Sequence, residues 1–239
     1  PNSVSDPRAD RGTPQYRRAL IALFCAGLAT FAQMYAPQGL LPQIGREFSV
    51  DPGSSTWIIG ATTIGVAVSA LPWARVSDRL GRVTTMRWAA AAAMVIGLTV
   101  PFAPTFDTMI VLRAFEGIAL GGLPAVAVTA LAETVHPRSL GAAVGSYVAG
   151  TTIGGLVGRL VAGGVADPFG WRFGLGAVAI LAAVAAVAFL VLIPKTAVPP
   201  PPGDRIFGAL LANLRNPGVL VLVLQAVLLM GGFVSVSNT

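Results

Sequence analysis

A short charged segment separates two long apolar stretches in the first half of the chain. Its residues are Asp78-Arg79-Leu80-Gly81-Arg82, and Arg75 and Arg87 flank it. A lipid bilayer accommodates such a cluster only at its surface, and positive charge gathers on the cytoplasmic side of membrane proteins. The segment therefore predicts a tight cytoplasmic turn between two membrane-spanning helices.

The composition supports a membrane protein rather than a soluble one. Hydrophobic residues make up 54% of the chain and charged residues only 11%, whereas a soluble domain contains about 25% charged residues. The net charge of +6 is spread over the gaps between apolar stretches instead of along one face. The positive-inside rule explains this distribution, so we expect a lipid bilayer as the surroundings and no nucleic-acid partner.

The apolar stretches predict an all-α membrane protein. About 20 apolar residues suffice to cross a bilayer, and we expect six spans followed by the start of a seventh near residue 219. The six expected spans are residues 19–42, 56–73, 87–103, 108–135, 140–166 and 171–193. The fold class is therefore a six-helix transmembrane bundle followed by a linker and a seventh helix.

The domain limits and the orientation follow from prolines and charges. We expect a cytoplasmic tail over residues 1–18, the bundle over 19–193, a cytoplasmic proline-rich linker over 194–217 and the start of a second bundle over 218–239. Four consecutive prolines at 199–202 favour an extended linker. Of the 16 Lys and Arg residues, only Arg46 and Arg172 fall in gaps on the other side. We therefore expect the N-terminus inside and a multi-pass location in the inner membrane.

Two ionisable residues fall within the predicted fourth span. Arg113 and Glu116 are three positions apart and so share one helix face. Charged groups inside a membrane are costly and usually functional, and a carboxylate beside an arginine can serve as a proton or substrate switch. The alternative is an arginine that reaches the membrane surface, with Glu116 only neutralising it.

The predicted fifth span is rich in glycine. Gly150, Gly154 and Gly158 recur every four residues, which permits close helix crossing. Arg159 interrupts the same span at a depth similar to that of Glu116, so the two side chains could meet. The alternative is that these glycines serve packing alone.

Further polar residues suggest a gate and a cavity. Glu133 ends the predicted fourth span on the cytoplasmic side, where an ion pair with Arg79 or Arg82 could latch helix ends together. Three polar residues within spans either form helix–helix hydrogen bonds or line a polar cavity. They are Gln33, Tyr35 and Gln225.

The sequence does not predict an enzyme, a metal site or a cofactor. His136 is the only histidine and Cys25 the only cysteine, so neither a Ser-His-acid triad within the membrane nor a zinc ligand set can be assembled. A phosphate-binding glycine loop is also lacking.

The segment from Ala74 to Arg82 resembles the loop motif between the second and third helices of the major facilitator superfamily. It differs from that motif at Ala74, where the family usually has glycine, and at Val83, where a second basic residue is common. The resemblance implies that Asp78, Arg82 and Glu133 form a charge network that stabilises one access state, with Arg79 and Gly81 in the same motif.

Two further motifs resemble those of the same superfamily. Arg113-Ala114-Phe115-Glu116-Gly117 is similar to its fourth-helix motif, whose arginine is linked to proton coupling, although glutamine is usual at the position of Glu116. Gly145, Gly154 and Gly158 match the spacing of the fifth-helix motif of the drug/proton antiporter branch, with Arg159 where proline is usual. Gly158-Arg159-Leu160 and Trp171-Arg172 look like bacterial sugar or multidrug efflux permeases.

The resemblance implies a transporter of about twelve helices in two halves. The chain corresponds to the first half, the linker and a seventh helix, so we expect a fragment that needs the missing C-terminal half for transport. The function expected is proton-coupled efflux of a small organic molecule by alternating access, with Arg113, Glu116 and Arg159 in proton coupling. The alternatives are an importer or symporter on the same fold and a non-transporting membrane fragment.

Overall fold

The computed structural model describes residues 8–194 and, further along, residues 217–218, 220–221, 224–225 and 228. Within residues 8–194 the backbone is helical apart from connections and one isolated β-bridge. In chain order the elements are α1 (Pro14–Tyr35), η1 (Ala36–Leu40), α2 (Leu41–Phe48), α3 (Pro52–Ser55), α4 (Trp57–Leu80), α5 (Arg82–Thr99), η2 (Val100–Phe102), α6 (Phe106–Leu120), α7 (Pro124–Thr134), α8 (Pro137–Phe169) and α9 (Trp171–Leu192).

Six helical stretches of this region are long and apolar enough to cross a membrane. They are Pro14–Phe48, Pro52–Leu80, Arg82–Phe102, Phe106–Thr134, Pro137–Phe169 and Trp171–Leu192. The prediction of an all-α, six-helix transmembrane bundle is therefore confirmed. The predicted linker lies almost wholly outside the described residues, as does most of the seventh helix, of which the isolated described positions are helical.

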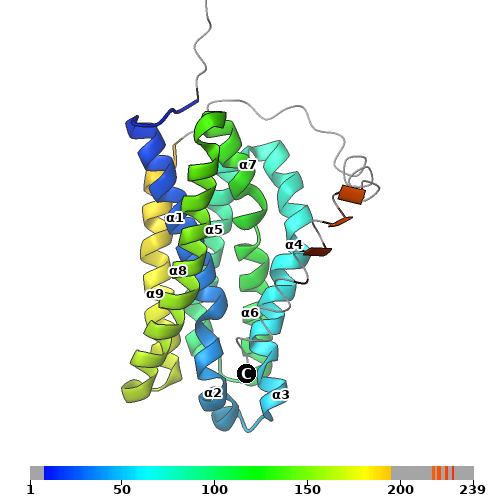
Figure 1. Ribbon diagram of the computed structural model, residues 1–239. Helices are drawn as coiled ribbons and strands as arrows, with labels where there is room; N and C mark the ends of the chain where they lie inside the picture. The colour runs from blue at the N-terminus through cyan, green and yellow to red at the C-terminus, as the bar shows by residue number, and fades with distance from the viewer. Residues whose placement is uncertain (1–7, 195–216, 219, 222–223, 226–227, 229–239) are drawn as a thin grey trace, which may run out of the picture. The chain divides into compact units, whose positions relative to one another are not determined.

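The long helices run between two ends of the bundle. We call them the Asp78 end, where α1 begins and α7 ends, and the Phe169 end, where α2 and α3 lie (Figure 1). The charged segment at the Asp78 end is not the turn that the sequence predicted. Helix α4 continues through Asp78 to Leu80, and α5 begins at Arg82, so Gly81 alone joins them. Its φ of 87° is accessible to glycine and rarely to other residues.

Two prolines interrupt stretches that the sequence predicted as continuous helices. Pro37 lies in η1, where the first span tightens into a 3-10 helix. Pro124 begins α7, and residues 121–123 before it form turns, in which the N–H groups of Gly122 and Leu123 bond three residues back instead of four. Proline has no N–H to donate and its ring clashes with the preceding turn, so the predicted single helix over residues 108–135 is two helices.

Helices α1 and α8 cross in close contact because three glycines lie between them. A Cβ at Gly154 would lie 2.7 Å from the Cα of Leu28, and a Cβ at Gly158 would lie 2.7 Å from the Cα of Ala32. Gly150 contacts the backbone of Phe24 in the same way. The expected close crossing is confirmed for these glycines. Gly145 differs, since nothing lies within 4 Å of the position of its Cβ.

Helices α4 and α6 cross by the same device. A Cβ at Gly65 would lie 2.5 Å from the carbonyl oxygen of Ala114, and Gly117 contacts the backbone of Thr62. Gly121 continues the row one turn further and contacts Val66. Gly117 and Gly121 follow Arg113 at four-residue spacing on its own side of α6, so α4 passes close beside the buried charge.

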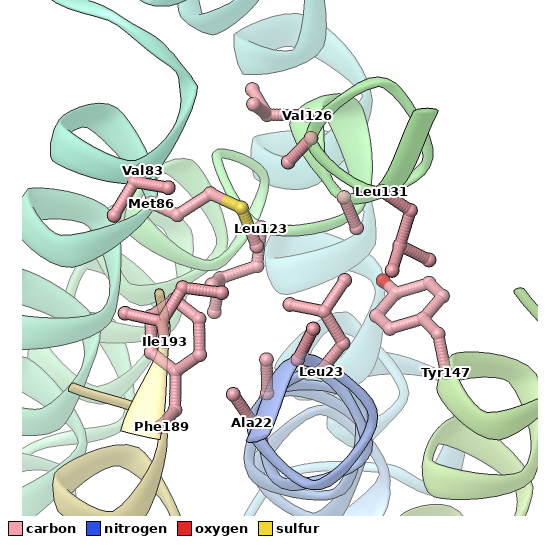
Figure 2. Packing of buried hydrophobic residues seen from close by; sticks show 14 of the residues in the cluster. Ala22, Leu23, Val83, Met86, Leu123, Val126, Leu131, Tyr147, Phe189 and Ile193 are labelled. Atoms are coloured by element: carbon pink, nitrogen blue, oxygen red, sulfur yellow. The ribbon is translucent and has the colours of Figure 1, made fainter. Parts of the chain in front are cut away.

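Apolar side chains fill the bundle in two main clusters. The cluster at the Asp78 end includes Leu23, Met86, Leu131 and Phe189, each with at most 1% of its surface exposed (Figure 2). The cluster at the Phe169 end includes Ile44, Ile58, Met109 and Trp171.

The start of the described chain is attached to the connection between α7 and α8. The N–H of Ala9 donates to the carbonyl of Thr134 at 2.9 Å, and the N–H of His136 donates to the carbonyl of Ala9 at 2.9 Å. The Asp10 carboxylate accepts hydrogen bonds from the N–H of Arg11 and, at 3.2 Å, from the hydroxyl of Ser139. The bond from Arg11 is the main reason that the pKa of Asp10 lies below its usual value.

Alanine substitution distinguishes glycines that pack from one that does not. Gly154→Ala forces a methyl group onto the backbone of Leu28, and we expect a loss of about 2 kcal/mol in the free energy of unfolding. Gly145→Ala is the matched control on the same helix, and we expect it to be neutral or to stabilise by up to about 1 kcal/mol. Equilibrium unfolding of the chain in mixed micelles measures both. Equal effects of the two substitutions would contradict the close crossing.

Candidate functional site

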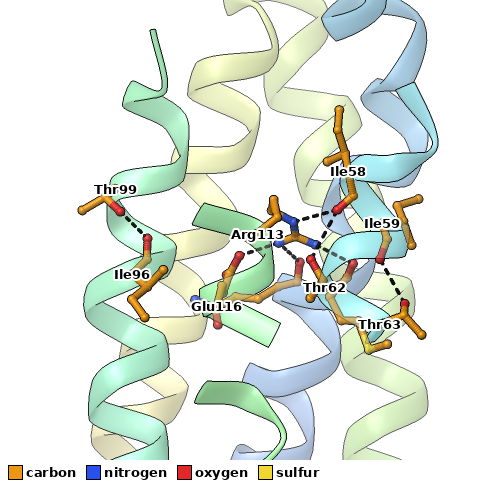
Figure 3. Close-up of polar contacts among 10 residues, drawn as sticks. Ile58, Ile59, Thr62, Thr63, Ile96, Thr99, Arg113 and Glu116 are labelled. Carbon is orange, nitrogen blue, oxygen red and sulfur yellow. Dashed lines mark hydrogen bonds and ion pairs between the residues drawn. The ribbon is translucent and has the colours of Figure 1, made fainter. Parts of the chain in front are cut away.

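Arg113 is buried where α1, α4 and α6 meet. Only 2% of its surface is exposed. Its Nε donates to the carbonyl of Ile58 on α4 at 3.2 Å, and its terminal nitrogens donate to the carbonyls of Gln33 at 3.1 Å and Met34 at 3.0 Å on α1. It also donates to Oε2 of Glu116 at 2.6 Å (Figure 3). One guanidinium therefore joins three helices, and Glu116 on the same helix neutralises its charge.

Proline explains why a carbonyl of α1 is available to this arginine. In a helix, the carbonyl of Gln33 would accept from the N–H of residue 37. Residue 37 is proline, which has no N–H, and the chain there turns into η1. The planar fork of a guanidinium can reach several acceptors at once. The carbonyl of Gln33, which Pro37 leaves without a backbone donor, thus accepts from Arg113 instead.

Glu116 lies beside a small cavity. Only 1% of its surface is exposed, and its second oxygen, Oε1, would lie 3.0 Å from a Cβ at Gly97. The amide nitrogen of Gln33 also faces Gly97 and has no hydrogen-bond partner among the described residues. The cavity between these groups and α9 measures about 20 Å³, which is enough for one water molecule.

The sequence-based prediction of an Arg113–Glu116 pair is confirmed. The alternative of an arginine that reaches the membrane surface is wrong, because both side chains are buried. The predicted meeting of Arg159 with Glu116 is not found in the described part of the chain. Arg159 instead lies over the ring of Tyr35, with its Cζ 5.1 Å from the ring centre. Gln33, predicted to line a cavity, belongs to the buried site around Arg113.

A second polar cluster lies at the Asp78 end. Arg82, the first residue of α5, donates to the hydroxyl of Ser77 at 2.7 Å and to Oδ1 of Asp78 at 2.5 Å on α4. Its Nε donates to Oε1 of Glu133 on α7 at 3.1 Å. Of the two arginines predicted to reach Glu133, Arg82 does so, whereas Arg79 is exposed in the last turn of α4. The cluster connects α4, α5 and α7.

The sequence did not predict a third cluster at the Phe169 end. Arg172 donates to Oε1 of Glu47 at 2.9 Å and to the carbonyl of Pro101 at 2.8 Å, while the indole N–H of Trp171 donates to Oε2 of Glu47. These contacts join the ends of α2 and η2 to the start of α9. Glu47 is more than one hundred positions away from both Trp171 and Arg172. Neither the spacing along one helix face nor a local motif could therefore predict these bonds.

The remaining predicted residues lie apart from these clusters. Gln225 is exposed on one of the isolated described helical positions, in a part of the chain whose placement relative to the bundle is not determined. Among the described residues, no three His, Cys, Asp or Glu side chains are placed to hold a metal ion.

Removing one partner of the buried pair should destabilise the protein more than removing both. Arg113→Gln leaves the Glu116 carboxylate buried without its counter-ion, and we expect a loss of about 3 kcal/mol in the free energy of unfolding. The double substitution Arg113→Gln with Glu116→Gln should be less damaging than Arg113→Gln alone. Arg46→Gln, at an exposed position, is the control for loss of one positive charge. Strict additivity of the two single substitutions in a double-mutant cycle would contradict the pairing.

Comparison with known proteins agrees with this architecture. The family model described as Major Facilitator Superfamily matches residues 21–239. The chain is 35% identical over 231 residues to the uncharacterized MFS-type transporter YybF of Bacillus subtilis, covering 95% of this chain and 57% of that protein. It is 34% identical over 241 residues to the inner membrane transport protein YnfM of Escherichia coli, covering 99% and 58%.

Solved structures show the same fold. The peptide transporter POT in complex with sulfate superposes with a TM-score of 0.67 at 17% identity, covering 97% of this chain and 49% of that one. The chain thus spans slightly more than half the length of these curated relatives and about half of that structure. It is a multi-pass membrane protein with the helices of one half of such a transporter, and this family comprises transporters rather than enzymes. The chain belongs to the major facilitator superfamily of secondary transporters.

Proposed function

We propose that the chain is the N-terminal half of a proton-coupled exporter of small organic molecules. The observation that carries this proposal is the buried Arg113–Glu116 pair. A titratable carboxylate beside an arginine that holds three backbone carbonyls couples the charge of one side chain to the contacts among α1, α4 and α6. The spacing of Gly145, Gly154 and Gly158 on α8 supports the antiporter branch, and the arginine motif on α6 supports proton coupling.

Protonation of Glu116 is the switching step in this mechanism. A proton on the carboxylate removes its negative charge and weakens its bond to Arg113. The guanidinium is then held only by the carbonyls of α1 and α4, so the balance between the two access states changes. The cavity of about 20 Å³ beside Glu116 and Gln33 gives a water molecule room to carry the proton. One charge that crosses 100 mV supplies about 2.3 kcal/mol.

The Arg82 cluster acts as the gate at the opposite end of the bundle. The side chains of Arg82, Asp78 and Glu133 are 11%, 18% and 12% exposed, so their ion pairs are partly screened by solvent and individually modest. A gate needs contacts of this kind, because each transport cycle must break them. We place this end in the cytoplasm because of the positive-inside distribution. The location is then the inner membrane, as for the inner membrane transport protein YnfM.

Neutralising Glu116 should uncouple transport from the proton gradient. We expect Glu116→Gln in the full-length transporter to reduce gradient-driven accumulation about a hundredfold. The measurement is uptake of radiolabelled drugs, sugars and organic acids into inverted membrane vesicles, with and without a protonophore. Asp107→Asn makes the same chemical change at an exposed position of α6 and should behave as the unmodified protein. Wild-type coupling in Glu116→Gln would remove this residue from the mechanism.

Weakening the gate should expose residues behind it. Thr85 is fully buried on α5, one turn beyond Arg82, so a cysteine placed there reports opening of the Asp78 end. We expect Arg82→Gln to raise its labelling rate by a polar maleimide about fivefold, since partly exposed ion pairs contribute about 1 kcal/mol. Arg79→Gln, the control on the neighbouring exposed arginine, should leave the rate unchanged. Equal rates in all three proteins would refute the gate.

A further inference from the structure

Arg159 is a second arginine within a membrane-spanning helix. It lies ten residues before the end of α8 at Phe169, about 15 Å along the axis of a helix that is about 50 Å long. Exposed leucines flank it on the same helix, at positions 156 and 160. An arginine at such a depth is too costly to face hydrocarbon, so it faces protein or an aqueous path.

The charge of Arg159 is not balanced by any described residue. Arg113, Arg82 and Arg172 each form an ion pair with a carboxylate. Arg159 forms none in the described part of the chain, and its buried Nε has no hydrogen-bond partner there. Its guanidinium lies over the ring of Tyr35 on α1. A cation–π contact orients a guanidinium but does not neutralise it.

The surrounding backbone holds Arg159 and Tyr35 in place. Gly158 packs directly on Ala32 of α1, which fixes α8 against α1 at this level. A Cβ at Gly155 would lie 3.4 Å from the Tyr35 ring, so the ring rests against α8 one turn away from the arginine. The Cζ of Arg159 lies over the ring, and Nε, which has no partner in the described part of the chain, can still donate a hydrogen bond to an anion.

The side of α8 that carries Arg159 is open. Thr152 lies two turns away on the same side and is exposed, and Arg159 itself is half-buried. Toward the Phe169 end the same side packs on α9, because Ala166, seven residues after Arg159, contacts Gly174. The open part of this side therefore runs from Arg159 toward Thr152.

The chain contains no other obvious counter-ion. Of its ten Asp and Glu residues, only Asp6 and Asp204 fall outside residues 8–194, and both lie in polar segments rather than in an apolar stretch. Residues 205–239, which include the start of the seventh helix, contain no acidic residue. A buried or half-buried guanidinium in a low dielectric attracts an anion strongly.

We propose that Arg159, stacked on Tyr35, is the subsite that binds an anionic group, such as a carboxylate, of the transported molecule. The inference rests on the proposed transport function and specifies the substrate as an organic anion. Arg159 is then a substrate-binding residue, separate from the Arg113–Glu116 pair. The rival source of the anion is a carboxylate on another segment of the full-length transporter.

A cysteine at Thr152 measures the electrostatic potential beside Arg159 without knowledge of the substrate. The experiment uses the full-length transporter in a cysteine-free background in proteoliposomes, with Thr152→Cys modified by an anionic or a cationic methanethiosulfonate reagent. The two sites are about 10 Å apart along the helix. We expect the ratio of anionic to cationic rates to fall about tenfold when Arg159 is changed to Gln, and to be kept in Arg159→Lys. Arg46→Gln is the matched control for loss of a remote, exposed arginine and should leave the ratio unchanged.

Competition with benzoate and benzamide then tests anion binding. We expect benzoate to slow the anionic reagent at Thr152→Cys at least fivefold while neutral benzamide has no effect, and Arg159→Gln to abolish this protection. An unchanged rate ratio in Arg159→Gln would show that another carboxylate neutralises the arginine and would overturn the proposal. So would equal protection by benzamide, or no protection by benzoate.

Glu116→Gln separates this proposal from the proposed function. If Glu116→Gln loses coupling but keeps benzoate protection, both stand. If it keeps wild-type coupling, the proton-coupling mechanism fails, whereas the subsite is judged by the reporter at Thr152 alone. Loss of benzoate protection in Glu116→Gln, with the rate ratio unchanged, would overturn the assignment of separate roles to Arg159 and the Arg113–Glu116 pair.

Discussion

The contact of α1, α4 and α6 depends on the hydrogen bonds of one buried guanidinium. Arg113 on α6 donates to backbone carbonyls of both α1 and α4. Because the acceptors are backbone carbonyls, their side chains can be substituted without loss of these bonds. A shift of the backbone of α1 or α4 would break them. Removing the charge from water costs free energy, and the four acceptors offset that cost. The position of α1 against α4 is thus linked to the state of the Arg113–Glu116 pair.

Glycine rows make this geometry possible. The contacts of α8 with α1 and of α4 with α6 are backbone contacts, which leave no room for side chains. Lipid offers no hydrophobic drive for helix association, so close packing and polar bonds must supply it. The bonds from Arg113 to the carbonyls of α1 join these two helix pairs, whereas the Arg82 cluster joins α4 to α5 and α7. A motion of one pair against the other therefore has to break or rearrange the bonds of Arg113.

Much of this architecture could be predicted from the sequence. Apolar length identified the six spans, and the three-residue spacing of Arg113 and Glu116 identified their ion pair, because both are local properties of a helix. The prediction failed where the outcome depends on distant residues. The sequence placed Arg159 and Glu116 at similar depths, but depth alone does not show which arginine lies nearer to the carboxylate. In the structure Arg113 forms the ion pair with Glu116. The Glu47–Arg172 pair was missed for the same reason. Pro124 was a local signal for the helix break before it, but the continuous apolar pattern around it obscured that signal.

The bridge between Ala9 and the segment after α7 has a consequence for biosynthesis. Asp10 and Ser139, which bond beside it, are 129 positions apart. The ribosome makes the tail first, yet its partner segment exists only after α1 to α7 have been synthesised. The bridge therefore cannot close until the first four spans have been made.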